Sequence, residues 1–252
     1  PPIMRRLYSE DGRQLREVFR IAKEAGATTS CDMALPDPST ESGQAPWARI
    51  LENVLPYIDI FLPSAEEVLY MLEPENFNAM KVEHQDADLL DHLTAEDYAR
   101  LADKLLELGT KMTSLKSGHR GFYLRTGDKS RFAEMGAARP GEPETWSNRE
   151  LWCPAFAAPD LASATGSGDS SIAGFLAAFL RGLSPEECLR YANCLGWQNV
   201  QELDAITGIH DWDESTGLLG RDMPQNDLPL DQAGWTWQAD LRLWSSPRDG
   251  RG

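Results

Sequence analysis

The alternation of short predicted strands with helical segments constrains the fold of this chain more than any other feature of its sequence. Short strands are predicted at residues 28–32, 58–61 and 112–116, and the segment at 47–54, between two of them, repeats its apolar residues at helical spacing. Strands that alternate with helices of about ten residues build a largely parallel sheet with helices on its faces. The sequence therefore predicts an α/β fold.

Capping residues indicate where further helices begin and end. A helix is expected from Asp11 to a terminating Gly26, another over residues 64–71, and a third that Thr94 opens and Gly109 ends. Ser or Thr followed three residues later by an acidic residue is a start signal and Gly is a stop signal, because both satisfy backbone groups that a helix end leaves unpaired.

The remaining segments are expected to form loops or a hairpin. Polar stretches at residues 73–91 and 136–150 are interpreted as surface loops or insertions and not as domain linkers. Near the C-terminus, Trp and Leu alternate with polar residues on both sides of Asp240, which predicts a small Trp-rich β-hairpin. These features divide the chain into a main portion, residues 1–209, and a tail, residues 210–252.

Charge and hydropathy exclude several classes of partner. Lys plus Arg number 24 against 40 Asp plus Glu, a formal net charge of −16, and this sign opposes binding to nucleic acid or anionic membranes. There is no run of about 18 apolar residues and no apolar signal-peptide core at the start, so a cytoplasmic protein without membrane contact is expected. The cysteines lack Cys-x-x-Cys spacing and are expected to be buried free thiols, namely Cys31, Cys153, Cys188 and Cys194.

The segment at residues 163–176 carries the chemistry. Gly166 and Gly168 flank Ser167 immediately before a predicted helix. Glycines let backbone N–H groups converge on a ligand and a helix start adds partial positive charge, so this turn predicts an anion-binding site. Asp169, at the same helix start, is stabilised as a carboxylate and could take a proton from a nearby hydroxyl group.

The alternative interpretation of Asp169 is structural. Aspartate is a favoured N-cap residue, and in an arbitrary protein Gly-x-Gly-Asp before a helix more often marks a flexible turn with a capping aspartate. Both interpretations stay open on these residues alone.

Position along the predicted sheet indicates further candidates. Ligands of parallel α/β sheets bind beyond the carboxyl ends of the strands. Asp32, Ser64 and the stretch at 116–118 each follow a predicted strand at that end. These residues are therefore site candidates before any family motif is considered.

The segment around Asp169 resembles the second signature of the ribokinase-like, PfkB-type carbohydrate kinases, Asp-Thr-x-Gly-Ala-Gly-Asp followed by an apolar helix. The resemblance implies that Asp169 is the catalytic base. It places stabilisation of the transferring phosphoryl group on the backbone of Gly166, Ser167 and Gly168. It also assigns Thr165 to the nucleotide site.

Two positions depart from this signature. Ser163 stands where the family has its first Asp, and Ala164 where it has Thr. The resemblance implies ATP and Mg²⁺ as cofactors. Because the missing Asp helps to form a monovalent-cation site in many members, activation by potassium is doubtful here.

Similarity continues downstream of the signature. Residues 184–187, Ser-Pro-Glu-Glu, predict the start of the next helix with a capping box, as in the family's Leu-Ser-x-Glu-Glu-Ala segment. Residues 191–196 look like the family's Ala-Asn-Ala-Ala-Gly helix beside the adenine. The resemblance implies adenine-side roles for Gly196 and Asn199. Ordinary helix packing is the alternative for both.

Similarity also continues upstream. Residues 62–67 resemble the family's Pro-Asn-x-x-Glu motif, which implies that Glu67 supports the magnesium shell. Ser64 and Glu67 also form a capping-box pattern, so a structural role is the alternative, and both roles can hold together. Asp32 occupies the place of the family's Asp-Pro-Asn strand end and is assigned to the substrate, although Ala34 departs from the usual Asn.

A third upstream match concerns the turn after a predicted strand. Residues 115–121 look like the family's Lys-x-Gly-x-x-Gly turn near the nucleotide. The resemblance implies that Lys116 contacts a phosphate and that Gly118 and Gly121 belong to the nucleotide site.

The resemblance covers residues 26–209 and implies a ribokinase-like fold that carries out ATP-dependent phosphoryl transfer to a hydroxyl group of a sugar or sugar-like small molecule. The family's first strands, substrate lid and Gly-Gly signature are not recognised, so an N-terminally incomplete chain is expected. Because the lid often makes the dimer contact in related kinases, a homodimer is expected only of a full-length protein. The alternative function is a non-catalytic member of the same fold that binds a nucleotide or metabolite as a sensor.

Overall fold

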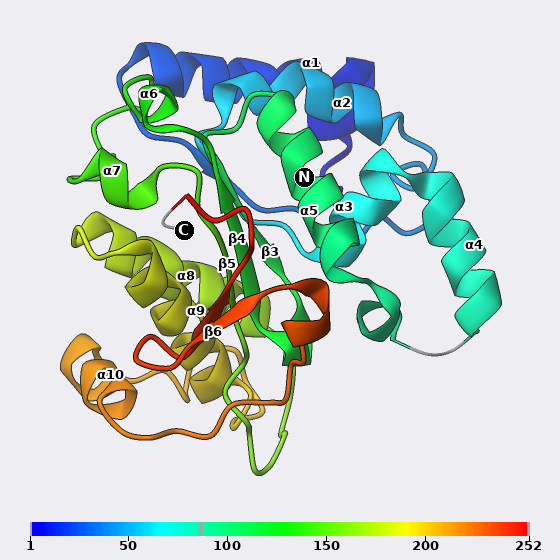
Figure 1. The fold of residues 1–252 in the computed structure, drawn as a ribbon. Helices are drawn as coiled ribbons and strands as arrows, with labels where there is room; N and C mark the ends of the chain where they lie inside the picture. Colours follow the sequence, from blue (N-terminus) through cyan, green and yellow to red (C-terminus); the bar gives the residue numbers. More distant parts are fainter. Residues whose placement is uncertain (1, 86–87, 251–252) are drawn as a thin grey trace. The chain divides into compact units, whose positions relative to one another are not determined.

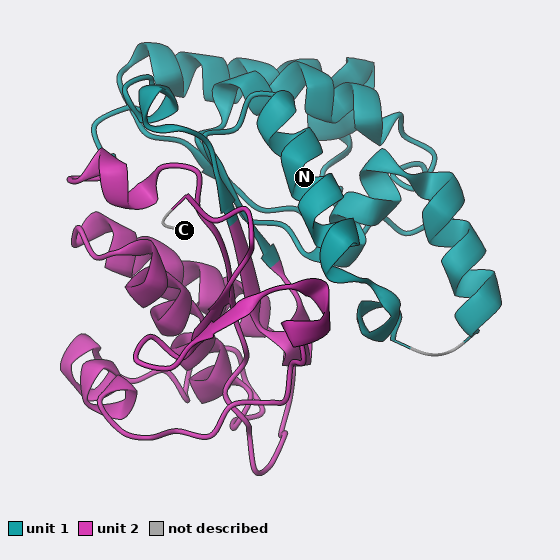
Figure 2. Cartoon of the chain, in the orientation of Figure 1, with its two compact units in different colours: residues 1–115, 125–139 teal, residues 116–124, 140–252 magenta. Residues whose placement is uncertain are grey.

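The computed structural model describes residues 2–85 and 88–250. The chain forms two compact units (Figure 2). Unit 1 consists of Pro1–Leu115 and Arg125–Arg139, and unit 2 of Lys116–Leu124 and Pro140–Gly252. The division predicted at residue 209 is not a boundary between these units and stays a prediction.

Unit 1 contains parallel strands separated by helices, as the alternating pattern predicts. Strand β1, Ser30–Cys31, pairs in parallel with β2, Ile60–Phe61, and Cys31 lies opposite Phe61. Strand β2 pairs in parallel with β3, Met112–Lys116. The helical elements (Figure 1) are α1 Arg5–Glu24, α2 Trp47–Val54, η1 Leu55–Tyr57, α3 Ala65–Leu72, α4 Pro74–His84, η2 Leu89–His92, α5 Ala95–Glu107 and α6 Lys129–Phe132.

Unit 2 contains antiparallel strands and a packed helix pair. Strand β7, Leu243–Ser245, lies between β5, Glu150–Cys153, and β6, Thr236–Gln238, and is antiparallel to both. The pairing of β6 with β7 confirms the predicted hairpin. Helices α8 and α9 pack side by side and α10 contacts α9. The remaining elements of this part of the chain are η3 Gly118–Arg120, β4 Phe122–Thr126, α7 Pro143–Trp146, α8 Ser167–Leu180, α9 Pro185–Asn199, α10 Trp212–Leu219 and η4 Asp231–Ala233.

Capping boxes confirm three of the predicted helix starts. In each, the side chain of the N-cap residue accepts from the backbone N–H three residues on, and the acidic side chain there accepts from the N-cap N–H; the pairs are Ser64 with Glu67, Thr94 with Asp97 and Ser184 with Glu187. The predicted stop at Gly109 also holds. Its φ is 121°, and a Cβ there would lie 2.8 Å from Cα of Pro56, so only glycine fits.

The two stretches interpreted as loops contain helices, so those predictions are wrong in part. Helix α4 occupies much of 73–91, starts with Pro74 and buries Phe77, which packs edge-to-face on Tyr70. Helix α7 lies within 136–150 and buries Trp146. Each helix buries one side chain, and a single apolar residue leaves no periodicity for the sequence to reveal.

The first helix begins earlier than predicted and is interrupted. Helix α1 starts at Arg5, and its backbone leaves the right-handed helical conformation at residues 9–12 before the predicted segment continues. At Gly12, where φ is 77°, a Cβ would lie 2.7 Å from Cγ2 of Ile50. The left-handed turn therefore coincides with the closest approach of α1 to α2.

The cysteines are buried and free, as predicted. Burial raises the pKa of the Cys153 and Cys194 thiols to about 11, so both are protonated at neutral pH. Within residues 2–85 and 88–250, no cluster of three or more His, Cys, Asp or Glu side chains could hold a metal ion. In the same ranges, no helix is both long enough and apolar enough to cross a bilayer.

Candidate functional site

The glycine-rich turn at the start of α8 has free backbone donors. Gly166 is the N-cap residue with a φ of 83°, and the first helical hydrogen bond runs from the Ser170 N–H to the Gly166 carbonyl at 2.8 Å. The N–H groups of Gly168 and Asp169 precede this bond and donate to no described residue. A helix start of this kind can bind an anion through these two groups.

Close packing fixes the conformation of this turn. A Cβ on Gly166 would lie 2.6 Å from Cβ of Ala205 and 3.4 Å from Nδ2 of Asn199, so glycine is required there for space as well as for φ. Asn199 is fully buried and donates from Nδ2 to the Ala205 carbonyl at 2.8 Å. Asn199 thereby holds the segment around Ala205 against the turn.

Asp169 is the third residue inside α8 and is not its N-cap. Helix α8 has no side-chain cap, since its N-cap is Gly166. The Asp169 side chain is exposed and has no hydrogen bond or ion pair with a described residue. The capping interpretation is therefore wrong, and the carboxylate stays available at the positive end of the helix.

Lys116 brings a positive charge to the same turn. A Cβ built on Gly168 would lie 3.4 Å from Cδ and 4.0 Å from Nζ of Lys116. The Lys116 ammonium group thus lies close to the turn that contains the free N–H groups of Gly168 and Asp169, and these donors could share the charge of a phosphate.

The turn after Lys116 is tightly closed. The Ser117 N–H donates to the Gly121 carbonyl at 2.9 Å, and the Gly121 N–H donates to the Gly118 carbonyl at 3.0 Å. Gly121 has a φ of 91°, and a Cβ there would lie 2.1 Å from the Cys153 carbonyl oxygen. Gly118 and Gly121 therefore shape the backbone beyond Lys116, and a contact of theirs with a nucleotide stays a prediction.

The model of the pfkB family of carbohydrate kinases matches residues 10–212 of this chain. The chain belongs to this family. Among curated proteins, an uncharacterized sugar kinase of Archaeoglobus fulgidus is 23% identical over 172 residues, which cover 68% of this chain and 50% of that protein.

Solved structures of the pfkB family share the fold. Arabidopsis thaliana ribokinase, complexed with ribose and ATP, superposes with a TM-score of 0.56 at 23% identity, over 84% of this chain and 53% of that one. A putative ribokinase II from E. coli, in complex with ATP and Mg²⁺, gives a TM-score of 0.51 at 21% identity, over 82% and 53%. The chain spans about half the length of these relatives.

One of the two signature departures, Ser163, has a local structural role. The Ser163 Oγ accepts from the Thr165 N–H at 3.1 Å, whereas Ala164 contributes only its backbone carbonyl, which accepts from the Ser167 hydroxyl at 2.9 Å. Ser163 thus closes the turn with a neutral group in place of a carboxylate. A monovalent cation does not gain a negatively charged ligand at this position, whereas the donors of the neighbouring turn fit a phosphate.

Gly196 serves helix packing in this pfkB member. A Cβ on Gly196 would lie 2.3 Å from Oγ of Ser171, and one on Gly174 would lie 2.4 Å from the Tyr191 carbonyl oxygen. These two glycines let α8 and α9 approach closely. The packing alternative for Gly196 therefore holds, and its adenine-side role, like that of Asn199, stays a prediction.

Unit 1 carries the other two predicted site residues. Asp32 follows β1, is half-buried and accepts from the Met33 N–H through Oδ1 at 2.7 Å. Glu67 is 9% exposed and accepts from the Ser64 N–H through Oε2 at 2.8 Å. Both follow the carboxyl ends of neighbouring parallel strands. The capping role of Glu67 is confirmed, while its role toward Mg²⁺ and that of Asp32 toward a substrate stay predictions.

Sequence reasoning missed the segment that supports the turn. Residues 201–209 contain no motif, yet Ala205 contacts Gly166 and determines which residue fits there. The one available signal was Asn199 at the end of a helix, where a buried amide often holds a neighbouring loop.

Proposed function

We propose that this pfkB-family protein transfers the γ-phosphoryl group of ATP to a hydroxyl group of a sugar or sugar-like small molecule. One observation carries the proposal: in unit 2, the first turn of α8 contains two free N–H groups and the exposed Asp169 side chain, and the Lys116 side chain lies next to Gly168 in that turn. The relatives solved with ribose and ATP, or with ATP and Mg²⁺, support the same chemistry.

Each residue of the candidate site has a separate role in the proposed reaction. The N–H groups of Gly168 and Asp169, with Lys116, receive the negative charge of the phosphoryl group as it moves. The Asp169 carboxylate accepts the proton of the substrate hydroxyl group. At the same time the hydroxyl oxygen forms a bond to the γ-phosphorus, and the bond between that phosphorus and the leaving oxygen of ADP breaks. Bound Mg²⁺ neutralises phosphate charge and commonly takes one or two carboxylates, a role we assign to Glu67. Asp32 is assigned to the substrate.

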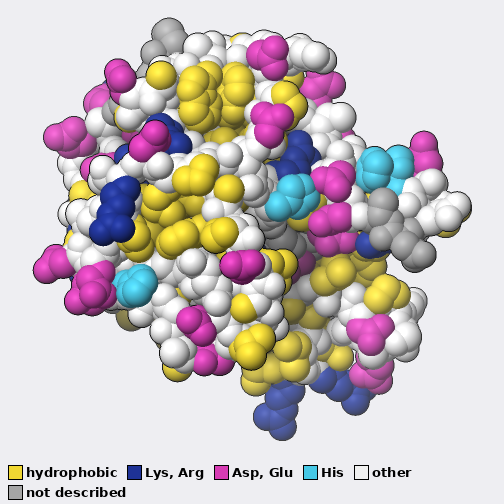
Figure 3. Space-filling view, turned by 90° about the horizontal axis from the view of Figure 1, so that it is seen from below, with side chains coloured by type: hydrophobic (Ala, Val, Ile, Leu, Met, Phe, Trp, Pro, Cys, Tyr) yellow, Lys and Arg dark blue, Asp and Glu magenta, His cyan; other side chains and the backbone are white. Residues whose placement is uncertain are grey.

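The charge distribution of the protein is better suited to binding a small anionic cofactor than a polyanionic partner. On the face shown in Figure 3, Lys and Arg side chains lie in separate groups among acidic ones. The net charge of −16 opposes nucleic acid, so local donors must hold the phosphates. We place the enzyme in the cytoplasm and expect no nucleic-acid or membrane partner.

Turnover against a panel of sugars tests the proposal directly. The whole protein, with MgATP and each sugar in turn, should release ADP only when a particular sugar is present, and the product should carry one phosphate by mass. MgATP binding by calorimetry without turnover on any hydroxylated substrate would favour the alternative, a non-catalytic sensor of the same fold.

Replacing Lys116 by Met should weaken MgATP binding by about 10- to 150-fold, because hydrogen bonds to charged groups contribute about 1.5–3 kcal/mol. The alkyl part of the side chain, which lies next to Gly168, is retained in Met. Calorimetric titration with MgATP measures the change. Lys81→Met, which removes a surface ion pair with Glu66 in unit 1, is the control and should bind as the parent does. Equal affinities for the two variants would remove Lys116 from the phosphate site.

A further inference from the structure

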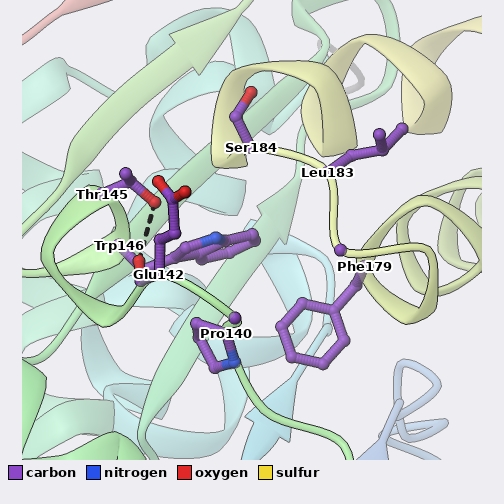
Figure 4. A pocket seen from close by; sticks show the side chains of 9 residues that line it. Pro140, Glu142, Thr145, Trp146, Phe179, Leu183 and Ser184 are labelled. Carbon is purple, nitrogen blue, oxygen red and sulfur yellow. Dashed lines mark hydrogen bonds between the residues drawn. The ribbon is translucent and has the colours of Figure 1, made fainter.

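A pocket of about 450 Å³ lies in unit 2 at the opposite end of α8 from the glycine-rich turn (Figure 4). It forms where α7, the end of α8 and the start of α9 meet. Its walls combine apolar side chains with a few polar ones, among them Pro140, Glu142, Thr145, Trp146, Phe179 and Leu183. Pockets of about 300–1,000 Å³ with this mixture are of the size that holds small molecules.

Buried contacts hold the walls of this pocket in place. Trp146 packs edge-to-face on Phe179, with ring centroids 5.4 Å apart. The Arg149 side chain donates to the Thr145 carbonyl at 2.9 Å and pairs with Glu186 in the first turn of α9 at 2.7 Å. Because Arg149 and Glu186 are both buried, α7 and α9 are tied together and the pocket is preformed.

The charge of the pocket favours a cation. Glu142 is its only charged lining residue, and no described residue forms a hydrogen bond or ion pair with the Glu142 carboxylate. The negative end of the α8 dipole adjoins the pocket through Phe179 and Gly182. At the start of α9, the capping box engages the N–H groups of Ser184 and Glu187.

We propose that this pocket binds a small organic cation, a primary amine whose ammonium group pairs with Glu142 and whose apolar body lies against Pro140, Phe179 and Leu183. In Figure 4 the Glu142 side chain extends beside the Trp146 ring and next to the side chain of Thr145. The Thr145 hydroxyl group donates to the Glu142 carbonyl, so its oxygen can accept a further N–H bond from the ammonium group.

The pocket is separate from the turn proposed to bind the nucleotide. Helix α8 has 14 residues between the two, and a rise of 1.5 Å per residue places its ends about 20 Å apart. The amine site is therefore independent of the proposed function, and its failure and that of the kinase proposal are distinguishable.

Calorimetry with 2-phenylethylamine, and with 2-phenylethanol as a neutral analogue, tests whether binding depends on the positive charge of the ligand. The amine should bind once per chain with a Kd below about 1 mM, and the alcohol at least tenfold more weakly. Glu142→Gln should reduce the amine's affinity at least tenfold and leave that of the alcohol unchanged. Glu144→Gln, which removes the same charge from the same helix outside the pocket, should bind as the parent does. Equal affinity of amine and alcohol, or equal losses in both variants, would overturn the proposal.

A second variant tests the location. Gly141 lines the pocket, and a Cβ there would meet no atom within 4 Å, so Gly141→Leu should fold normally and occupy the open space. We expect an unchanged melting temperature and loss of amine binding. Parent-like binding by Gly141→Leu, or displacement of the amine by MgATP, would place the amine elsewhere and overturn the proposal.

Discussion

Replacing Asp169 by Asn should lower kcat of the whole protein by about 10²- to 10⁴-fold and leave the Kd for MgATP nearly unchanged. A hydroxyl group attacks phosphorus poorly until its proton begins to leave, and Asn cannot accept that proton. The fold should tolerate the change, because the Asp169 side chain is exposed and makes no cap or ion pair with a described residue. Steady-state kinetics and MgATP calorimetry on the same preparation measure both quantities.

The matched control removes a carboxylate of the same kind from the loop before the turn. Asp160 is also exposed, so Asp160→Asn changes the net charge equally without touching α8. It should retain the parent kcat. A kcat for Asp169→Asn within a few-fold of the control would contradict the assignment of Asp169 as the base, and an equal loss in both variants would indicate a long-range charge effect.

Local signals explain why much of the fold could be predicted. The starts of α3, α5 and α9 rest on a hydroxyl and a carboxylate three residues apart, and this pair acts through contacts within one turn. The parallel strands of unit 1 are short, but they alternate with helices along the chain, and this order already indicates β-α-β units.

Two helices that each bury a single side chain were not predicted. Helix α4 buries Phe77 against Tyr70, and α7 buries Trp146 against Phe179. In both cases the stabilising partner lies on another element, so the polar sequence of the helix itself resembles a loop. The interruption of the first helix was not predicted for a related reason, because the backbone near Gly12 packs against Ile50 on α2.

In the candidate site too, features set by the local sequence could be predicted, and features set by tertiary contacts could not. Gly166 was identifiable because a left-handed turn before a helix favours glycine, whereas Gly168 lies inside the first turn of α8, where a Cβ would come no closer than 3.4 Å to the Lys116 side chain. The position of Asp169 inside the helix was not identifiable, because the sequence does not show which residue of a turn becomes the N-cap. The contact of Ala205 with Gly166 joins residues about forty positions apart in a segment without periodicity, and only the folded chain brings them together.

Replacing Trp235 by Ala should lower the free energy of unfolding by about 3–5 kcal/mol, the usual cost of truncating a large buried aromatic side chain. Trp235 is 7% exposed and lies just before β6. Its ring centroid is 6.1 Å from that of Trp152 on β5 and 6.2 Å from that of Tyr123 on β4. Loss of the indole ring would open a cavity between the hairpin and these strands, which urea unfolding monitored by circular dichroism would detect.

Trp237→Ala, in the same hairpin, is the control. It distinguishes the effect of removing a buried indole ring from the effect of removing a tryptophan at a more exposed position. Trp237 is 39% exposed, against 7% for Trp235, and packs edge-to-face on Trp244 at 5.3 Å, so folding buries less of its surface. Its replacement should cost less than half as much as that of Trp235. Because neither ring lies in the turn of α8, both variants should keep the parent Kd for MgATP. Equal destabilisation of the two would mean that the hairpin is held by strand pairing of β7 with β5 and not by the buried indole, and a loss of MgATP affinity confined to Trp235→Ala would indicate that this ring contacts the nucleotide.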